Sequence, residues 1–260
     1  MWGAGFVEVS CKRLEYRCWG PEPDDGRAIV LLHEGLGCVA LWRDFPQRLQ
    51  EATGLPVLAY SRAGYGQSDP DDLPRPLNWM TREAVEVLPQ VLASFGLSQP
   101  ILLGHSDGAT IAAIYAGRQS LLGAPPLLAA VLMAPHFFTE EMGLAEIARA
   151  GEAFRTSDMA ARMAKYHRDP EATFRGWADA WLDPEFREWN VEHALDGVTC
   201  PVLAIQGRED QYGTLAQIEV VSRRVATAQT MVLDACQHVP HLEQSEAVLE
   251  IIGQFMQKNA

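Results

Sequence analysis

The sequence predicts an α/β fold with a mostly parallel central sheet and helices on both faces. Two observations predict it. Short aliphatic runs, such as those over 29–32, 57–60 and 202–205, alternate with longer helical patterns along most of the 260 residues. Continuous aliphatic runs are typical of strands buried on both faces of a parallel sheet. The alternation of strands with helices places covering helices on both sides of such a sheet.

The individual elements follow in chain order. The turn-forming sequence PEPDDG separates two opening strands from the rest of the chain, since Pro, Asp and Gly favour turns. A helix is expected over 79–95 despite Pro89. The expected strands cover 6–10, 14–19, 29–32, 57–60, 101–103, 127–133, 202–205 and 230–233. The other expected helices cover 41–51, a segment directly after Gly108, and 241–257.

One interval breaks the alternation. Residues 134–198 contain no convincing strand, only helical segments rich in Arg, Glu, Met and Trp. We therefore expect a core and an inserted helical lid over the end of the sheet, with the core at 1–135 and 197–260 and the lid at 136–196. Tryptophans in the insertion either line a pocket or pack the lid onto the core. The residues concerned are Trp177, Trp181 and Trp189, of which Trp177 and Trp181 are the candidates for substrate binding.

Composition excludes several classes of partner. The chain has 21 Lys and Arg against 34 Asp and Glu, a formal charge of −13. Such a surface repels phosphate backbones and anionic lipid headgroups, so neither nucleic acid nor a membrane is expected as a partner. A neutral or cationic small molecule fits better. The oligomeric state is not predicted.

The cysteines and the N-terminal sequence indicate a cellular compartment. Five cysteines are scattered without a C-x-x-C pair, so we expect reduced thiols rather than disulfides or a zinc site. No apolar run reaches transmembrane length, and the start MWGAGFVEVSCKR lacks the pattern of a secretion signal. A cytoplasmic protein is expected on these grounds.

The sharpest motif is Gly104-His105-Ser106-Asp107-Gly108, which follows the aliphatic run ILL and precedes a helical pattern. A nucleophilic serine has to stand on a tight strand-to-helix turn, and the crowded backbone of that turn requires glycine on both sides. The helix that follows directs its N-terminal amide dipoles toward negative charge at the serine. The motif therefore predicts Ser106 as a nucleophile.

A serine needs a general base and an acid that orients the base. Among the seven histidines, His238 falls in the loop after the last expected strand, whereas His241 lies at a helix start, where it packs or caps. We expect the acid on an earlier loop at the same edge of the sheet. Asp210 satisfies this requirement better than the adjacent Glu209, and Asp234 is expected to pack locally.

Acyl transfer also needs N–H donors for the oxyanion of the tetrahedral intermediate. One is expected to be the backbone N–H of Asp107, the residue after the nucleophile. The other is expected in the loop His33-Glu34-Gly35-Leu36-Gly37, at Gly35, since a glycine allows the closest approach to substrate. Each donor is worth on the order of 3 kcal/mol in the transition state. His33 is expected to hold this loop rather than to act as a second base.

The order serine, acid, histidine is the chain order of α/β-hydrolases, and the sequence resembles that superfamily over essentially its whole length. The matching segments are LLHEGLG, YSRAGYGQSDP, LLGHSDGA, QGREDQYG and CQHVPHLEQ. Four positions depart from the superfamily pattern: Glu34 and Gln237 stand where glycine is usual, Ser61 where aspartate is usual and Ala63 where arginine is usual. The resemblance implies the α/β-hydrolase fold with a lid.

A closer similarity is to the biphenyl hydrolase-like proteins, a group that includes valacyclovir hydrolases and carries an S-D-G elbow. There the aspartate after the nucleophile is associated with binding the ammonium of amino-acid esters, and Asp107 is the matching residue. The physical argument agrees, because a carboxylate beside the nucleophile repels the forming oxyanion unless a cation neutralises it. A substrate ammonium or a nearby arginine such as Arg62 would serve, or the side chain turns away under the lid.

The leading expectation is a serine hydrolase that cleaves small carboxylic esters, amino-acid esters among them, without a cofactor. Hydrolysis of a carbon–carbon bond or a lactone by the same residues is the alternative, and a non-catalytic small-molecule receptor is a further one. Haloalkane dehalogenases and ordinary epoxide hydrolases use aspartate at the elbow, so Ser106 counts against both activities. No metal is expected, since His238-x-x-His241 is the only short histidine pair and no third ligand is spaced to join it.

Overall fold

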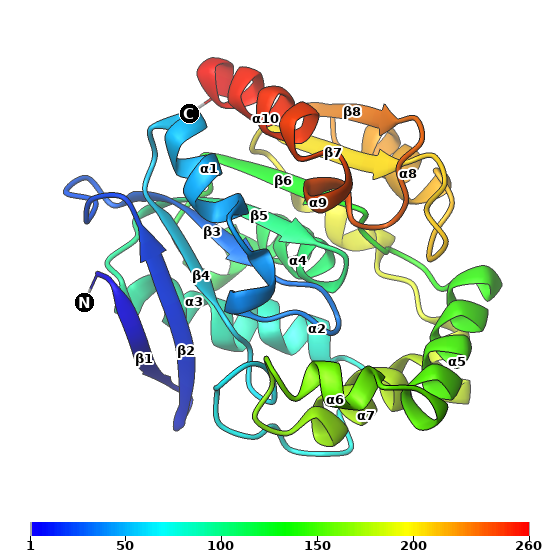
Figure 1. The fold of residues 1–260 in the computed structure, drawn as a ribbon. Helices are drawn as coiled ribbons and strands as arrows, with labels where there is room; N and C mark the ends of the chain where they lie inside the picture. The colour runs from blue at the N-terminus through cyan, green and yellow to red at the C-terminus, as the bar shows by residue number, and fades with distance from the viewer. Residues whose placement is uncertain (1, 260) are drawn as a thin grey trace.

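Eight strands form one sheet in the computed structural model, which describes residues 2–259 (Figure 1). Their order across the sheet is β1-β2-β4-β3-β5-β6-β7-β8, with β1 and β2 antiparallel to their neighbours and the other strands parallel. The α/β class and the mostly parallel sheet are therefore confirmed. The strands are β1 (Ala4–Val9), β2 (Lys12–Trp19), β3 (Arg27–Leu32), β4 (Val57–Tyr60), β5 (Gln99–His105), β6 (Ala129–Met133), β7 (Val202–Gly207) and β8 (Ala228–Leu233).

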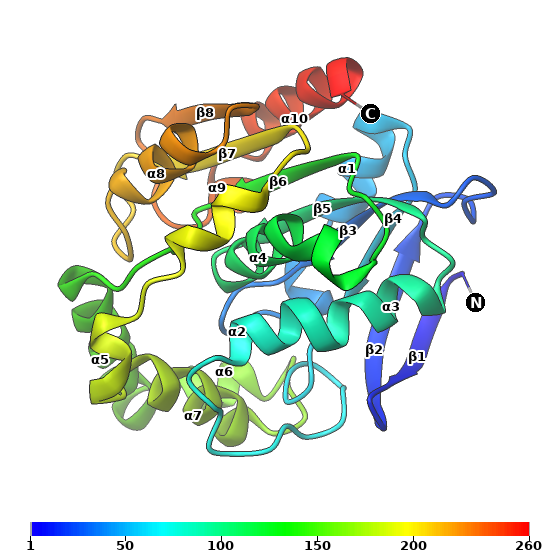
Figure 2. The same ribbon diagram turned by 180° about the vertical axis from the view of Figure 1, so that it is seen from behind.

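Helices cover both faces of the sheet and form two apolar cores with it (Figures 1 and 2). On one face lie α1 (Phe45–Thr53) and α10 (Ser245–Asn259), whose apolar side chains pack on β3, β5 and β6. On the other face lie α2 (Trp79–Arg82), α3 (Leu88–Ser94), α4 (Asp107–Leu122) and α8 (Ala216–Arg224). Strands β3 to β7 are almost wholly buried between these layers, which explains their continuous aliphatic sequences.

Two expected helices differ from the structure. The segment expected as one helix over 41–51 is a 3₁₀ turn, η1 (Val39–Trp42), followed by α1, because Arg43 has a left-handed backbone with φ 55°. The segment 79–95 is helical throughout Trp79–Ser94, but α2 and α3 are joined by a π-helical turn, η2 (Glu83–Val87). Pro89 begins the next turn, and the wider turn before it accommodates a residue without a backbone N–H.

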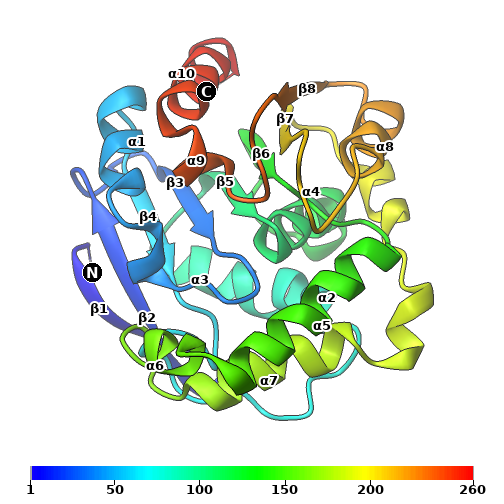
Figure 3. The same cartoon turned by 45° about the vertical axis from the view of Figure 1, so that its right-hand side comes forward.

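The strand-free interval carries helices at the carboxyl end of the sheet (Figure 3). They are α5 (Glu141–Thr156), α6 (Met159–Met163), α7 (Pro170–Trp181), η3 (Pro184–Glu188) and η4 (Glu192–Gly197). The chain segments that enter and leave this region run antiparallel and pair at Phe138 and Asn190. The last turn packs tightly on α4, since a Cβ on Gly117 would lie 1.7 Å from the carbonyl oxygen of Ala194. The lid limits of 136–196 remain a proposal.

The strand order brings two loops together at the middle of the sheet. From β3 the chain moves to β4 on one side, whereas from β5 it moves to β6 on the other. Ligands of α/β proteins bind at such a switch point, beyond the carboxyl ends of the strands. The loop 33–37 after β3 and the Ser106 turn after β5 both begin there. The closing residues form α9 (Pro240–Glu243) and α10, and no helix within 2–259 is long and apolar enough to span a membrane.

Candidate active site

Ser106 occupies a strained turn between β5 and α4. Its backbone has φ 53° and ψ −120°, and only a few per cent of residues other than glycine adopt positive φ. The turn is crowded on both sides. A Cβ on Gly104 would lie 2.2 Å from the carbonyl oxygen of Gly108, and one on Gly108 would lie 2.0 Å from that of Leu32. The glycines of the motif are therefore required by packing, and the serine side chain is presented at the end of the sheet.

Three side chains from three loops meet at this point. The imidazole Nε2 of His238 lies 3.0 Å from the hydroxyl oxygen of Ser106, and its Nδ1 lies 2.9 Å from both carboxylate oxygens of Asp210. A carboxylate only accepts hydrogen bonds, so Nδ1 carries the ring proton and Nε2 is free to accept the serine proton. All three side chains are buried. The structure thus brings together the three residues predicted from the sequence.

Asp210 is held as a carboxylate. Burial acts to raise its pKa, but attraction and a hydrogen bond to His238, together with the backbone N–H of Tyr212, outweigh burial and lower the pKa below the ordinary value. That N–H donates to Oδ1 at 2.8 Å, and the side-chain amide of Gln206 donates to Oδ2 at 3.3 Å. A fixed anion at this position keeps the His238 ring in one tautomer and one orientation.

The other candidates for base and acid lie elsewhere. His241 is buried between Trp42, Phe45 and His105, and burial lowers its pKa to about 3. It therefore packs, as the sequence analysis expected. Asp234 is 80% exposed and pairs with Arg208, so it also belongs to the surface.

Hydrogen bonds from neighbouring side chains to its carbonyl oxygens hold the loop after β3 in place. Arg62 donates from its guanidinium to the carbonyls of His33 and Glu34, and the His167 ring donates to that of Leu36 at 3.0 Å. His33 itself accepts from the Arg62 backbone N–H at 3.1 Å and lies 2.7 Å from the Glu34 carbonyl. His33 thus holds the loop. Arg62 is occupied by carbonyl groups, and no ion pair joins it to Asp107 within residues 2–259.

Gly35 and Asp107 stand where the two oxyanion donors were predicted. Asp107 is the first residue of α4, so its N–H has no acceptor within the helix. Gly35 lies under the lid, where a Cβ would meet the indole nitrogen of Trp177 at 2.1 Å. Both residues line the same pocket as Ser106. Their donation to an oxyanion remains a proposal.

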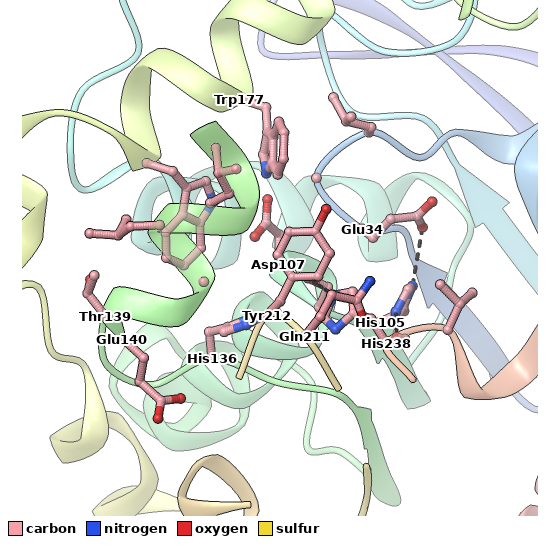
Figure 4. Close-up of a pocket in the computed structure, with 18 residues that line it drawn as sticks. Glu34, His105, Asp107, His136, Thr139, Glu140, Trp177, Gln211, Tyr212 and His238 are labelled. Carbon is pink, nitrogen blue, oxygen red and sulfur yellow. Dashed lines mark hydrogen bonds and ion pairs between the residues drawn. The ribbon is translucent and has the colours of Figure 1, made fainter. Parts of the chain in front are cut away.

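The pocket beside Ser106 has a volume of about 250 Å³ and lies between the sheet end and the lid (Figure 4). Its walls include Trp177 and Trp181 of α7 and the apolar residues Leu144 and Ile147 of α5. Trp189 instead stacks on Phe186. Helices α5 and α7 therefore supply an apolar wall of the pocket beside Ser106, and two of the three tryptophans line this pocket.

Asp107 places a carboxyl group in this wall. It is 1% exposed, and burial raises its pKa to about 6, although Arg62, Arg75 and the Trp181 side chain act in the opposite direction. Figure 4 shows the carboxyl directed toward the indole of Trp177. Its Oδ2 forms no hydrogen bond among the described residues, and no salt bridge there reaches it. Asp107 thus places a buried carboxyl group in the pocket wall, with one oxygen that has no hydrogen-bond partner within residues 2–259.

Sequence reasoning missed His136 and Tyr212. His136 follows β6 at the same sheet edge, its ring packs on Trp181, and burial lowers its pKa to about 4, so the ring is neutral. Tyr212 covers the His238 ring at 4.6 Å between ring centroids. His136 could have been found from the sequence, because it lies in the loop after an aliphatic strand. Tyr212 lies two residues after Asp210, but nothing in the sequence shows where its side chain points. Oδ2 of Asp107, Nδ1 of His136 and Nε1 of Trp181 are all buried without a hydrogen-bond partner within 2–259.

No group of three or more His, Cys, Asp or Glu side chains within the described residues has the arrangement of a metal site.

A strained serine turn, a histidine and a carboxylate at the switch point of an α/β sheet define a hydrolase of the α/β class. Residues 29–251 match the model of the alpha/beta hydrolase family. The chain belongs to this family and is a hydrolase.

The chain is also similar to individual proteins along most of its length. A proline iminopeptidase of Heyndrickxia coagulans is 27% identical over 98% of this chain and 99% of its own length. The serine hydrolase BPHL of Mus musculus is 25% identical over 96% of this chain and 85% of its own length. Among solved structures, the enol-lactonase of Burkholderia xenovorans LB400 has a TM-score of 0.74 at 18% identity and covers 97% of this chain and 100% of its own. The last similarity shows the fold alone.

Proposed function

We propose that the chain is a serine hydrolase that cleaves small carboxylic esters through an acyl-enzyme on Ser106. The observation that carries the proposal is the unbroken line of contacts from the Ser106 hydroxyl through the His238 ring to Asp210, at 3.0 and 2.9 Å. This geometry provides an activated nucleophile, a base and an orienting acid. The pocket of about 250 Å³ accommodates a small acyl group.

In the proposed reaction the Ser106 oxygen attacks the ester carbonyl carbon while His238 Nε2 takes the hydroxyl proton. The N–H groups of Gly35 and Asp107 stabilise the oxyanion of the tetrahedral intermediate. His238 then returns the proton to the leaving alcohol as the ester C–O bond breaks. A water molecule attacks the acyl-enzyme by the same route, releasing the acid and restoring Ser106. Asp210 stabilises the transient imidazolium of His238 throughout.

The preferred substrates are proposed to carry an ammonium group on the acyl side. Asp107 supports this, because its carboxyl lies beside the nucleophile without an ion-pair partner within residues 2–259. The indoles of Trp177 and Trp181 add π faces, which attract cations. A cation here offsets the repulsion between Asp107 and the oxyanion, so its effect is largest in the transition state.

The first experiment replaces the nucleophile. Ser106→Ala should lower hydrolysis of p-nitrophenyl acetate or butyrate at least about a thousandfold without unfolding the protein. Ser120→Ala, which removes an exposed hydroxyl from the same helix, is the matched control and should keep full activity. If turnover survives in Ser106→Ala, Ser106 is not the nucleophile. Wild-type protein that neither turns over esters nor reacts with a fluorophosphonate would support a receptor instead.

The second experiment tests the ammonium group. Asp107→Ala should lower kcat/KM for amino-acid esters at least about tenfold more than for neutral esters of the same shape, because only the former lose an ion pair in a buried site. Equal losses for both substrates would refute the ammonium role and leave the ester reaction standing.

A second candidate is cleavage of a peptide-like bond after an N-terminal proline. It is favoured by the similarity to proline iminopeptidases along the whole chain. Ser106, assisted by His238 and Asp210, can also attack an amide carbonyl. The amine of an N-terminal proline is cationic at neutral pH and can pair with the Asp107 carboxylate. Comparing proline esters with proline anilides separates the two activities. Lactones and vinylogous diketones in the same panel test the lactone and carbon–carbon alternatives.

A further inference from the structure

Glu34 stands where a glycine is usual in related loops, and its carboxylate has a specific partner. Oε2 of Glu34 lies 3.4 Å from Nδ1 of His105, the residue that precedes Ser106 (Figure 4). The Glu34 side chain is 29% exposed, whereas that of His105 is completely buried. The contact links the loop after β3 to the turn that carries Ser106.

The other nitrogen of the same ring holds a third loop. Nε2 of His105 lies 2.7 Å from the backbone carbonyl oxygen of His238. A carbonyl oxygen only accepts, so Nε2 carries a proton and donates it. Nδ1 is buried without a hydrogen bond within the described residues, and the Glu34 carboxylate lies at ion-pair distance from it. Both ring nitrogens therefore have an acceptor nearby, and this arrangement fits an imidazolium paired with Glu34. The His105 ring therefore connects the loop 33–37 after β3, the Ser106 turn and the loop that carries His238.

The groups around His105 are consistent with this charge. Burial acts to lower the pKa of His105, but Glu34, the His238 carbonyl and Asp210 outweigh burial and raise the pKa above the ordinary value. The neighbouring rings are those of His238 and His241, at centroid distances of 5.1 and 4.9 Å. A Glu34 carboxylate and a His105 imidazolium together carry no net charge, so the pair adds little to the field at the oxyanion.

We propose that Glu34 and His105 are positioning residues for the reaction: Glu34 orients the His105 ring, and His105 fixes the backbone of His238, so that the His238 imidazole stays aimed at Ser106. The inference rests on the proposed function, since it gives a role to residues that act through the proposed base. Misplacing a catalytic group by about 1 Å costs up to about a hundredfold in rate. Such a loss falls on kcat rather than on KM.

The test compares three variants of Glu34 and its partner. Glu34→Ala removes the anchor of the His105 ring and should lower kcat at least about tenfold, with KM within about twofold. Glu34→Gln keeps a side chain that can donate to Nδ1 and should retain kcat within about threefold of wild type. His105→Asn cannot reach the His238 carbonyl and should match Glu34→Ala. Glu83→Gln, which alters a half-buried carboxyl bonded to Tyr60 outside the pocket, is the control.

A readout independent of turnover follows the ring itself. Nitrogen NMR of His105 at pH 7.5 should show an imidazolium in the wild type and a neutral ring protonated at Nε2 in Glu34→Gln, because burial then acts without the anion. Adding Glu34→Ala to His105→Asn should cause no further loss in kcat, since both changes break the same chain of contacts.

Three results would overturn the inference: wild-type kcat in Glu34→Ala, equal losses in Glu34→Ala and Glu34→Gln, or additive losses in the double variant. A Glu34→Ala protein that does not fold leaves Glu34→Gln and His105→Asn to decide by the same criteria. The proposed function has a separate test. If Ser106→Ala abolishes turnover while Glu34→Ala leaves kcat intact, the positioning role fails and the serine mechanism stands.

Discussion

The indole of Trp177 lies directly against the backbone of Gly35. A methyl group added at Gly35 would come within 2.1 Å of the indole nitrogen and 2.4 Å of Cδ1. Trp177 belongs to lid helix α7, whereas Gly35 belongs to the loop proposed to donate to the oxyanion. Helix α7 and this loop therefore share one packing surface, and the position of one constrains the other.

Gly35→Ala should disturb both elements at once. The added Cβ has to displace either Trp177 or the loop, so kcat/KM should fall at least about tenfold. Steady-state kinetics with p-nitrophenyl butyrate measures the loss, and tryptophan fluorescence reports the displaced indole. Gly151→Ala on lid helix α5 meets no atom within 4 Å and is the matched control. Wild-type kinetics in Gly35→Ala would show that the contact does not constrain the site.

Asp210→Asn should lower kcat by about a thousandfold to ten-thousandfold while keeping the fold. The amide cannot hold the His238 tautomer that leaves Nε2 free to accept the serine proton. Asp234→Asn, which alters the exposed partner of Arg208, should leave kcat within about twofold. Ester hydrolysis at pH 7.5 compares the two variants. The reverse pattern would make Asp234 the orienting acid.

Asp107 makes stability depend on pH. Its pKa is about 6 in the folded protein against an ordinary value of 3.8, so the folded state binds more protons between these values and stability falls as pH rises through this window. The difference corresponds to about 3 kcal/mol above pH 6. Asp107→Asn should therefore raise the free energy of unfolding by up to about 3 kcal/mol at pH 8, and by much less at pH 4.5.

Urea unfolding at the two pH values measures this effect. Asp179→Asn, on the exposed face of the lid, is the control and should show no such pH-dependent gain. A gain in Asp107→Asn that is the same at both pH values would contradict a buried, ionised Asp107. A gain at pH 8 combined with lost activity on amino-acid esters would identify a residue kept for function at the expense of stability.

Much of the fold could be predicted, because the strands at the sheet centre are continuous aliphatic runs. The residues of β4 were expected without error, and the edges of β5 and β7 differ only by a few residues. The break at Arg43 could not be predicted, since an arginine with positive φ has no sequence signature. The π-helical turn before Pro89 likewise depends on tertiary packing.

In the candidate site, too, some residues could be predicted from the sequence and others could not. Ser106, Asp210 and His238 were predictable because each lies in the loop or turn that follows a strand, and parallel strands end at one edge. The roles of neighbouring side chains depend on direction, which spacing does not encode. Glu34 could be recognised as a departure from the usual glycine, but its pairing with His105 becomes visible only in three dimensions.

Mass spectrometry of the protein treated with a fluorophosphonate tests the central proposal most directly. The account predicts a single covalent adduct on the peptide containing Ser106, absent in Ser106→Ala and formed far more slowly in His238→Ala. A wild-type protein that hydrolyses esters but carries no adduct, or carries it on another residue, would contradict the proposal that Ser106 is the nucleophile.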